Sequence, residues 1–381
     1  MPNTVPPGRT VGIIGGGQLG RMLAEAASPL GIDVIVLDPT SNCPAALPAR
    51  DQIVGGFDDE DRIRELAERS DVLTVEIELA DPGALQAASD ALGVPVHPDP
   101  ETLRVTRDKL VEKRRLAEAG IPVPSFTGVE SVADLRDAFQ DLGSPVMVKA
   151  RRGGYDGRGN AIVESVAEAR DRFGSLEGLV AEEEVPFERE LSVIAARGAE
   201  MTRQFSVAEN LHEAEVLRET LVPARTDESV KDRAFGVAQD VLAALDGRGV
   251  FGIELFETGD GTILVNEIAP RPHNSGHYTI EGAVTSQFEQ HLRAVLGLPL
   301  GDTSLREPTA MVNILGEGQE SRPASVAGVE SVMELGDVHL HWYGKRTVRP
   351  LRKMGHLTAY HSSLGRARER VWQARDALSF G

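Results

Sequence analysis

Two apolar segments separated by a glycine turn, residues 250–256 and 262–268, carry one glutamate each. Apolar runs on either side of the sequence Gly-Asp-Gly predict an antiparallel hairpin. Glu254 and Glu267 would then be neighbours in buried surroundings, where two carboxylates repel each other unless a cation lies between them. Hard divalent cations that also hold phosphates, chiefly Mg2+, are bound by one or two such carboxylates. The alternative is a pair of glutamates that face solvent on an edge strand.

The charge of the whole chain limits the kinds of partner that it can bind. With 40 Lys+Arg against 59 Asp+Glu among 381 residues, the net charge is −19. Such a surface repels nucleic acid and anionic membranes. An anionic substrate must therefore be held by a local basic cluster. Residues 271–277, with one arginine and two histidines, form one such cluster, and residues 345–353, with five lysines and arginines, form another.

Composition also indicates the compartment and the number of domains. No stretch approaches the about 18 apolar residues of a membrane span, and Cys43 is the only cysteine. Because an internal disulfide is impossible, we expect a cytoplasmic protein. The acidic charge and the lack of an apolar span predict no nucleic-acid or membrane partner. A length of 381 residues predicts two or three domains.

Residues 10–20 predict a buried strand, a glycine turn and the start of a helix. Gly15, Gly17 and Gly20 match the spacing G-x-G-x-x-G. Asp38 ends the next predicted strand, where an acid binds ribose in a dinucleotide site. Any phosphate site or tight strand–helix turn can use the same glycines, so the motif leaves both interpretations open. Strands and helices alternate up to a short strand at 94–96, which predicts a small doubly wound domain.

The middle of the chain predicts a nucleotide-phosphate site. We expect a charged helix over 101–120, then an apolar strand over 145–150 that contains Lys149, whose ammonium needs an anion there. Residues 151–160 contain four glycines within seven residues, which let backbone N–H groups approach phosphate oxygens. Further helices are expected over 228–245, 279–296 and 364–377, and short β-like runs over 309–365. These breaks predict domains at 1–104, 105–300 and 301–381.

Lys149, the glycine loop 153–159, residues 182–185 with Glu190, and the pair Glu254/Glu267 occur in the order found in ATP-grasp enzymes. Together with the glycine turn at 15–20 and residues 266–277 and 343–345, they make residues 10–360 resemble the N5-carboxyaminoimidazole ribonucleotide synthetase family. The resemblance implies an α/β fold, α+β in parts. This would be an ATP-grasp fold with an N-terminal doubly wound pre-ATP-grasp domain, a two-lobed central ATP-grasp domain and a small C-terminal β-rich domain.

The resemblance implies ATP- and bicarbonate-dependent carboxylation of 5-aminoimidazole ribonucleotide through carboxyphosphate, in purine biosynthesis. A homodimer with Mg2+ or Mn2+ is implied as well. The nearer alternative is the formate-dependent glycinamide ribonucleotide transformylase of the same superfamily, against which the basic run 345–353 argues. The alternative from another class is an NAD(P)-dependent oxidoreductase that uses the glycine turn.

Three positions depart from the usual patterns of these enzymes. Leu79 stands where the family often has asparagine. Lys109 replaces a common arginine, which keeps the charge but gives up the bidentate fork. Ala269 stands where many other ATP-grasp enzymes have asparagine, which favours the purine-pathway branch.

The resemblance and the residue chemistry together suggest roles for individual residues. The expected ATP-binding residues are Lys109, Lys149, Gly154, Tyr155, Asp156, Gly157, Arg158, Gly159, Asn160, Glu182, Glu183, Glu184, Val185, Glu190, His212, Asn266 and Glu267. The expected metal ligands are Glu254 and Glu267. The expected residues for the aminoimidazole nucleotide are Gly17, Gln18, Leu19, Glu76, Tyr155, Arg158, Lys345 and Arg352. The expected catalytic residues are Asp156, Arg271, His273, Asn274 and Lys353.

Two expectations concern how these residues act. A third domain folded over the first would set Lys345 and Arg352 opposite the glycine turn, where the N–H groups of a helix N-terminus favour phosphate. Either Asp156 or His273 could accept the proton of the substrate amine. Phosphate released in the site could do so instead, and the sequence leaves this choice open.

Overall fold

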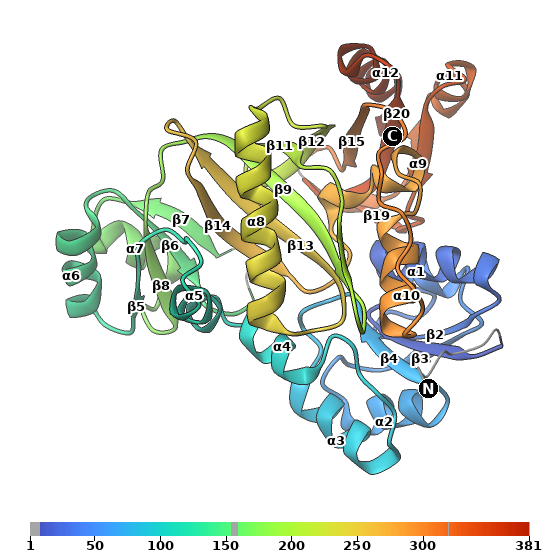
Figure 1. The fold of residues 1–381 in the computed structure, drawn as a ribbon, viewed down its shortest axis with the longest axis horizontal. Coiled ribbons are helices and arrows are strands. Elements are labelled where there is room, and N and C mark those ends of the chain that lie inside the picture. The colour runs from blue at the N-terminus through green and yellow to red at the C-terminus, as the bar shows by residue number, and fades with distance from the viewer. Residues whose placement is uncertain (1–7, 154–158, 319, 381) are drawn as a thin grey trace.

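The computed structural model describes residues 8–153, 159–318 and 320–380, whose arrangement is shown in Figure 1. A parallel N-terminal sheet, a small antiparallel lobe and one long antiparallel sheet make up its main parts. Within the described ranges, no helix is long and apolar enough to cross a membrane. The boundaries 104/105 and 300/301 stay predictions.

The N-terminal unit is doubly wound, with four parallel strands in the order β3-β2-β1-β4. Ile13 and Ile14, adjacent on β1, belong to separate cores on the two faces of the sheet. The expected strand at 94–96 forms only a bridge between Leu73 and Val96, because prolines at 95 and 98 lack the N–H groups that extend a ladder. The elements are β1 (Thr10–Ile14), α1 (Gln18–Ala27), η1 (Ser28–Leu30), β2 (Asp33–Asp38), η2 (Pro44–Ala46), β3 (Asp51–Val54), α2 (Glu60–Glu68), β4 (Val72–Val75) and α3 (Pro82–Leu92).

The single helix expected over 101–120 is wrong, because the structure has two helices, α4 (Pro100–Thr106) and α5 (Lys109–Glu118). Asp108 lies between them, and its carboxylate accepts the N–H groups of Leu110 and Val111. An aspartate in this position caps a new helix. Lys109 therefore begins α5.

The small lobe has four antiparallel strands in the order β5-β8-β6-β7, with two helices. Its elements are β5 (Phe126–Val129), α6 (Val132–Leu142), β6 (Val146–Ala150), β7 (Asn160–Val163), α7 (Val166–Phe173) and β8 (Leu179–Glu183). The strand expected to contain Lys149 is β6. The glycine-rich segment after it joins β6 to β7.

The long sheet has the strand order β14-β13-β9-β11-β12-β15-β20-β18, with β10 beside β9. Helix α8 crosses its face (Figure 1) and contributes Ala234, Ala238 and Val241 to the buried core. The elements up to the hairpin are β9 (Phe187–Arg197), β10 (Thr202–Gln204), β11 (Ala208–Glu213), β12 (Val216–Val222), α8 (Glu228–Leu245), β13 (Gly249–Thr258) and β14 (Ile263–Ala269).

The helix expected over 279–296 is interrupted. Ala283 is extended, which ends α9 (Thr279–Gly282), and Ser286 caps α10 (Gln287–Val295) by accepting the N–H of Glu289. The short helix η3 (Asn274–Gly276) precedes α9. The break places Gln287 at the start of a helix that packs against α1.

The C-terminal strands continue the long sheet, since β15 is hydrogen-bonded to β12. Helix α12 packs against β15 and β20, and Figure 1 shows it at the far end from the small lobe. The remaining elements are β15 (Thr309–Leu315), β16 (Arg322–Pro323), β17 (Val326–Ala327), α11 (Val329–Glu334), β18 (His339–Trp342), β19 (Thr347–Val348), β20 (Lys353–Tyr360), α12 (Leu364–Ala377) and β21 (Ser379–Phe380).

Candidate active site

The hairpin of β13 and β14 places Glu254 directly opposite Glu267, as the sequence predicts. Burial raises the pKa of Glu254; the charge of His212 opposes this rise and that of Glu267 adds to it. Lys109 Nζ lies 2.6 Å from Glu267 Oε2. Burial acts to raise the pKa of Glu267, but Lys109, with smaller contributions from Lys149 and Arg271, brings that pKa below its usual value. The carboxylate pair therefore attracts positive charge.

Two further ammonium groups share one buried carboxylate nearby. Lys149 Nζ donates to Glu182 Oε2 at 2.9 Å and to Asn266 Oδ1 at 3.0 Å. Lys113 Nζ lies 3.2 Å from the same Glu182 oxygen and donates to the Asn266 carbonyl at 3.3 Å. The side chain of Glu182 therefore acts as a counter-ion for two lysines, in addition to the adenine contact expected of its backbone.

Lys113 and Glu112 are not among the residues predicted for the site from the sequence. Lys113 lies four residues after Lys109, a spacing that puts both on one face of a helix, and this was the available signal. Glu112 is buried, and its Oε2 has no hydrogen-bond partner. Burial raises the pKa of Glu112 to about 8, against the opposing charges of the neighbouring lysines.

The expected adenine and ribose contacts lie where the two lobes join. Glu183 ends β8 and accepts the N–H of Ser125 at 3.0 Å, and Glu184 and Val185 form the link to β9. Glu190 Oε2 lies 2.6 Å from His212 Nδ1. Burial acts to lower the pKa of His212, but the hydrogen bond to Glu190 and the charges of Glu254 and Glu190 together raise it.

The glycine-rich segment between β6 and β7 is described only at its two ends. Gly159 has a positive φ of 92°, a conformation that favours glycine. Asn160 begins β7, and its Oδ1 is buried without a hydrogen-bond partner. The other predicted residues of this segment, Gly154, Tyr155, Asp156, Gly157 and Arg158, lie outside the described residues.

Residues 270–277 connect the nucleotide residues to the N-terminal unit. Arg271 Nη2 lies 2.5 Å from Glu78 Oε1, a partner that the sequence analysis left unassigned. His273 Nε2 lies 3.4 Å from Glu254 Oε1, and its Nδ1 lies 2.9 Å from Ser275 Oγ. Burial, together with the charges of Arg271 and Lys353, holds the pKa of His273 well below its usual value. The imidazole is therefore neutral at pH 7.

The other two expected catalytic residues, Asn274 and Lys353, also belong to this part of the structure. Asn274 forms a buried pair with Asn313 of β15, in which each amide donates to the other at 3.0 and 2.5 Å. Lys353 begins β20, and its charge contributes to the pKa values of both His212 and His273. The structure therefore brings Arg271, His273, Asn274 and Lys353 together.

The glycine turn before α1 is filled by carboxylates of the protein itself. Glu76 Oε1 accepts the N–H of Gly17 at 2.8 Å, and its Oε2 accepts that of Gly20 at 3.1 Å. Asp38, which the dinucleotide interpretation assigned to ribose, accepts the N–H of Gly16 at 2.9 Å. A Cβ atom at Gly17 would lie 2.9 Å from Glu76 Oε1, so the turn needs glycine to admit this carboxylate.

The same turn retains some capacity for a ligand. Gln18 and Leu19 are the first residues of α1, and the first N–H groups of a helix lack partners within it. Burial raises the pKa of Glu76 to about 7, although the N–H groups of Gly17 and Gly20 and the charge of Arg271 oppose the rise.

The C-terminal basic segment approaches α1 at its start. Tyr343 is buried in one cluster with Leu19 and Met22, and a Cβ atom at Gly344 would lie 3.1 Å from Arg21 Nη1. Lys345 Nζ donates to the Lys353 carbonyl at 2.7 Å. Arg352 Nη1 donates to the Thr347 carbonyl at 2.8 Å. The segment thus begins beside the glycine turn, whereas the placement of Lys345 and Arg352 against a substrate stays a prediction.

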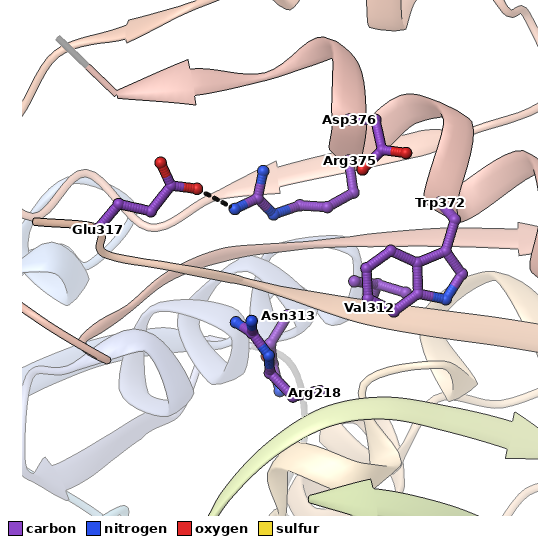
Figure 2. Close-up of a pocket in the computed structure, with 7 residues that line it drawn as sticks. All are labelled: Arg218, Val312, Asn313, Glu317, Trp372, Arg375 and Asp376. Carbon is purple, nitrogen blue, oxygen red and sulfur yellow. Dashed lines mark hydrogen bonds and ion pairs between the residues drawn. The ribbon is translucent and has the colours of Figure 1, made fainter. Parts of the chain in front are cut away.

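A separate cavity of about 290 Å³ lies between β15 and α12 (Figure 2). Its lining residues are Arg218, Val312, Asn313, Glu317, Trp372, Arg375 and Asp376. Arg375 reaches across it to an ion pair with Glu317. Among its lining residues, Asn313 links the cavity to a predicted site residue through its bond to Asn274.

Comparisons with known proteins agree with this arrangement. Residues 8–107 match the ribonucleotide synthetase preATP-grasp domain, residues 114–288 the ATP-grasp domain, and residues 309–370 the phosphoribosylaminoimidazole carboxylase C-terminal domain. The fold and the site therefore define an ATP-grasp enzyme, an ATP-dependent ligase.

Relatives of known name identify the family. The chain is 40% identical over 356 residues to N5-carboxyaminoimidazole ribonucleotide synthase of Bacillus subtilis, with 92% of this chain and 91% of the relative covered. It is 42% identical over 361 residues to the chloroplastic phosphoribosylaminoimidazole carboxylase of Vigna aconitifolia; 93% of this chain is covered, but it spans only 64% of that longer relative. The chain belongs to the N5-carboxyaminoimidazole ribonucleotide synthase family.

A solved structure supports the same family. N5-carboxyaminoimidazole synthase from Aspergillus clavatus, in complex with ADP and 5-aminoimidazole ribonucleotide, superimposes with a TM-score of 0.89 at 34% identity over 99% of both chains. The expected three-part ATP-grasp fold is confirmed. The transformylase and oxidoreductase alternatives are disfavoured by this membership.

Proposed function

We propose that the enzyme uses ATP and bicarbonate to carboxylate the exocyclic amine of 5-aminoimidazole ribonucleotide, in purine biosynthesis. The observation that carries this proposal is the position of His273, which lies 3.4 Å from Glu254 of the nucleotide cluster. Two residues before it, Arg271 pairs with Glu78 of the N-terminal unit. The neutral imidazole therefore stands between an ATP site and a second anion site. The names of the Bacillus and Aspergillus relatives support this substrate.

The chemistry has two steps. An oxygen of bicarbonate attacks the γ-phosphorus of ATP, and the bond to the β–γ bridging oxygen breaks to release ADP. The carboxyphosphate formed has a good leaving group on its carbonyl carbon. The amine nitrogen attacks that carbon, phosphate leaves, and the amine gives up one proton. Because carboxyphosphate hydrolyses readily, the site must exclude water.

Glu254 and Glu267 fit a divalent cation, Mg2+ or Mn2+. They stand opposite each other, and the charge of Glu267 adds to the raised pKa of Glu254. Among the residues that the structure describes, no group of three or more His, Cys, Asp or Glu side chains could hold a metal. Substrate phosphates and water would complete the coordination, which is usual for Mg2+. When bound, the ion would neutralise charge on the phosphate oxygens.

The remaining nucleotide contacts follow from residue chemistry. Lys109, Lys149 and His212 supply positive charge to the phosphates. Residues 182–185 present backbone groups to adenine, and Glu190 accepts hydrogen bonds from the ribose hydroxyls. Lys109 must leave Glu267 to reach a phosphate, and this exchange frees the carboxylate for the cation.

In the carboxylation step, Arg271 and Lys353 stabilise negative charge on carboxyphosphate and on the phosphate that leaves. Asn274 holds the loop through its pair with Asn313. The proton of the amine passes to His273, to Asp156 or to the released phosphate. His273 is the candidate with a described position, and its lowered pKa keeps it unprotonated at neutral pH.

The aminoimidazole nucleotide is placed at the glycine turn. The N–H groups of Gln18 and Leu19 donate to its phosphate together with the side chains of Lys345 and Arg352, and Glu76 contacts the ribose. Gly17, Tyr155 and Arg158 complete the predicted contacts. A homodimer and a cytoplasmic location remain part of the proposal, and sedimentation velocity tests the first.

Product analysis tests the proposed reaction. The purified enzyme is given ATP and 5-aminoimidazole ribonucleotide with bicarbonate, or ATP and glycinamide ribonucleotide with formate. We expect ADP and the N5-carbamate only in the first mixture. ADP release that does not depend on both bicarbonate and the aminoimidazole nucleotide would contradict the proposal.

A further inference from the structure

Gln287, the first residue of α10, is fully buried and binds the backbone of His273 at two points. Its Oε1 accepts the His273 N–H at 2.9 Å, and its Nε2 donates to the His273 carbonyl at 2.7 Å. The same Nε2 lies 3.3 Å from His277 Nδ1. The amide thus uses its acceptor and both of its donors on residues 273–277.

The loop needs such a partner because it is buried and belongs to no strand. A buried backbone N–H or C=O without a hydrogen bond is destabilising, so a side chain must replace the missing ladder. Gln287 is itself held in place, since its N–H donates to Thr279 Oγ1 at 2.9 Å. A Cβ atom at Gly276 would lie 2.7 Å from Gln287 Cδ, so glycine there leaves room for the amide.

We propose that Gln287 is a positioning residue for the carboxylation step, which it serves by fixing the backbone that carries His273. The ring of His273 itself contacts Ser275 Oγ at 2.9 Å, the Ser275 N–H at 3.4 Å and Glu254 Oε1 at 3.4 Å. Because Gln287 fixes the backbone of His273, the ring can rotate about its side-chain bonds but cannot move away from Glu254. This inference rests on the proposed function.

The same helix offers a matched control. Gln290 is also fully buried, and it binds the backbone of Gly301 in the same two-point way. Its Oε1 accepts the Gly301 N–H at 2.7 Å, and its Nε2 donates to the Gly301 carbonyl at 2.9 Å. Substitutions at Gln290 therefore reproduce the loss of a buried amide clamp, away from residues 270–277.

The test compares Gln287→Met with Gln290→Met, near-isosteric changes that add no charge. Both are measured for thermal unfolding, for the KM of ATP, and for the ratio of carbamate formed to ADP released. A misplacement of about 1 Å costs on the order of 10²-fold in rate, so we expect Gln287→Met to lose 10- to 100-fold in kcat, an estimate on the same basis. Its carbamate-to-ADP ratio should fall because carboxyphosphate hydrolyses, while the KM of ATP changes little. If both variants have equal ratios and rates, Gln287 is only structural and the inference is overturned.

A second pair, Gln287→Glu and Gln290→Glu, covers the case in which the methionine variants fold poorly. A carboxylate cannot donate to the His273 carbonyl, but a protonated carboxyl group can. The activity ratio of Gln287→Glu to Gln290→Glu should therefore rise as the pH falls, and a constant ratio would overturn the inference. Measurements on the wild-type enzyme distinguish failure of the proposed function from failure of the positioning role. If it forms no carbamate, the proposed function fails, whereas a carbamate-forming enzyme that is indifferent to Gln287→Met refutes only the positioning role.

Discussion

Lys109 and Glu267 form a 2.6 Å ion pair, although Lys109 is proposed to bind a phosphate of ATP and Glu267 a metal ion. Burial acts to lower the pKa of Lys109, but Glu267, Glu112 and Glu182 together outweigh it and raise that pKa to about 12. The lysine is thus fully charged at neutral pH, and the two residues hold each other in the charged forms that a phosphate and a metal ion require.

Lys109→Met should weaken ATP binding and change its pH dependence. Loss of one charge-assisted contact, about 1.5–3 kcal/mol, raises the KM of ATP about 10- to 100-fold. Because Lys109 lowers the pKa of Glu267, its removal raises that pKa. The acid limb of kcat/KM for ATP should then move to higher pH. An unshifted limb in the measured pH–rate profile would show that the pair does not govern Glu267.

Glu267→Gln keeps the size of the side chain and removes the charge opposite Glu254. We expect turnover to fall by at least about 10²-fold, because the proposed metal ligand is lost. Binding of 5-aminoimidazole ribonucleotide, measured by calorimetry without ATP, should stay close to that of the wild type. Near-normal turnover would refute the metal role.

Arg352→Ala should separate the two substrates. If Arg352 binds the phosphate of the aminoimidazole nucleotide, its loss raises the KM of that substrate about 10- to 100-fold, while the KM of ATP changes little. Arg366→Ala, which removes an exposed arginine of α12, is the control. An equal rise for both substrates, or tight NAD binding, would contradict the placement at the glycine turn.

His273→Ala and Asp156→Asn together test which group accepts the amine proton. A general base contributes about 10²- to 10⁴-fold, so the variant that lacks it should lose carbamate formation by this factor and keep ADP formation. Single-turnover kinetics with both products resolved measures this difference. Full activity in both variants would point to the released phosphate as the base.

Glu76→Gln tests the buried carboxylate through stability. The pKa of Glu76 rises from 4.5 to about 7 in the folded protein. Between these values the folded state keeps a proton that the unfolded chain has released, so stability from this group is lost as the pH rises. The difference in unfolding free energy between wild type and variant should therefore shift by on the order of 3 kcal/mol from pH 4.5 to 8, as measured by urea denaturation. No shift would show that Glu76 titrates normally.

Local pattern was enough to predict the hairpin and the opposition of Glu254 and Glu267, because a short turn fixes the register of the strands it joins. It was also enough for the doubly wound unit, whose strands alternate regularly with helices. The same pattern did not reveal the helix break at Asp108, because the charged sequence runs on without interruption there. The break comes from the Asp108 side chain, which caps a new helix.

Contacts between distant residues could not be predicted in this way. Glu76 fills a turn 59 residues earlier in the chain, and nothing in the glycine motif indicates that an acid of the protein will occupy it. Gln287 and Asn313 likewise support the site from other elements, 14 and 39 residues after their partners in the loop. Their buried amides form hydrogen bonds to backbone and side-chain groups that come close to them only in the folded chain.

The ladder between β12 and β15 has a consequence for how the chain can be divided. Thr220 pairs with Met311 and Leu221 with Ala310 across it, and the buried Glu219 beside them accepts from Arg368 and Trp372 of α12. A protein truncated after residue 300 would keep the proposed nucleotide residues from Lys109 to Glu267. It would nevertheless expose the unpaired edge of β12 and leave Glu219 without Arg368 and Trp372. Open edges recruit other chains, so such a fragment should aggregate before it binds ATP. Residues 105–300 and 301–381 should therefore be expressed and engineered as one piece.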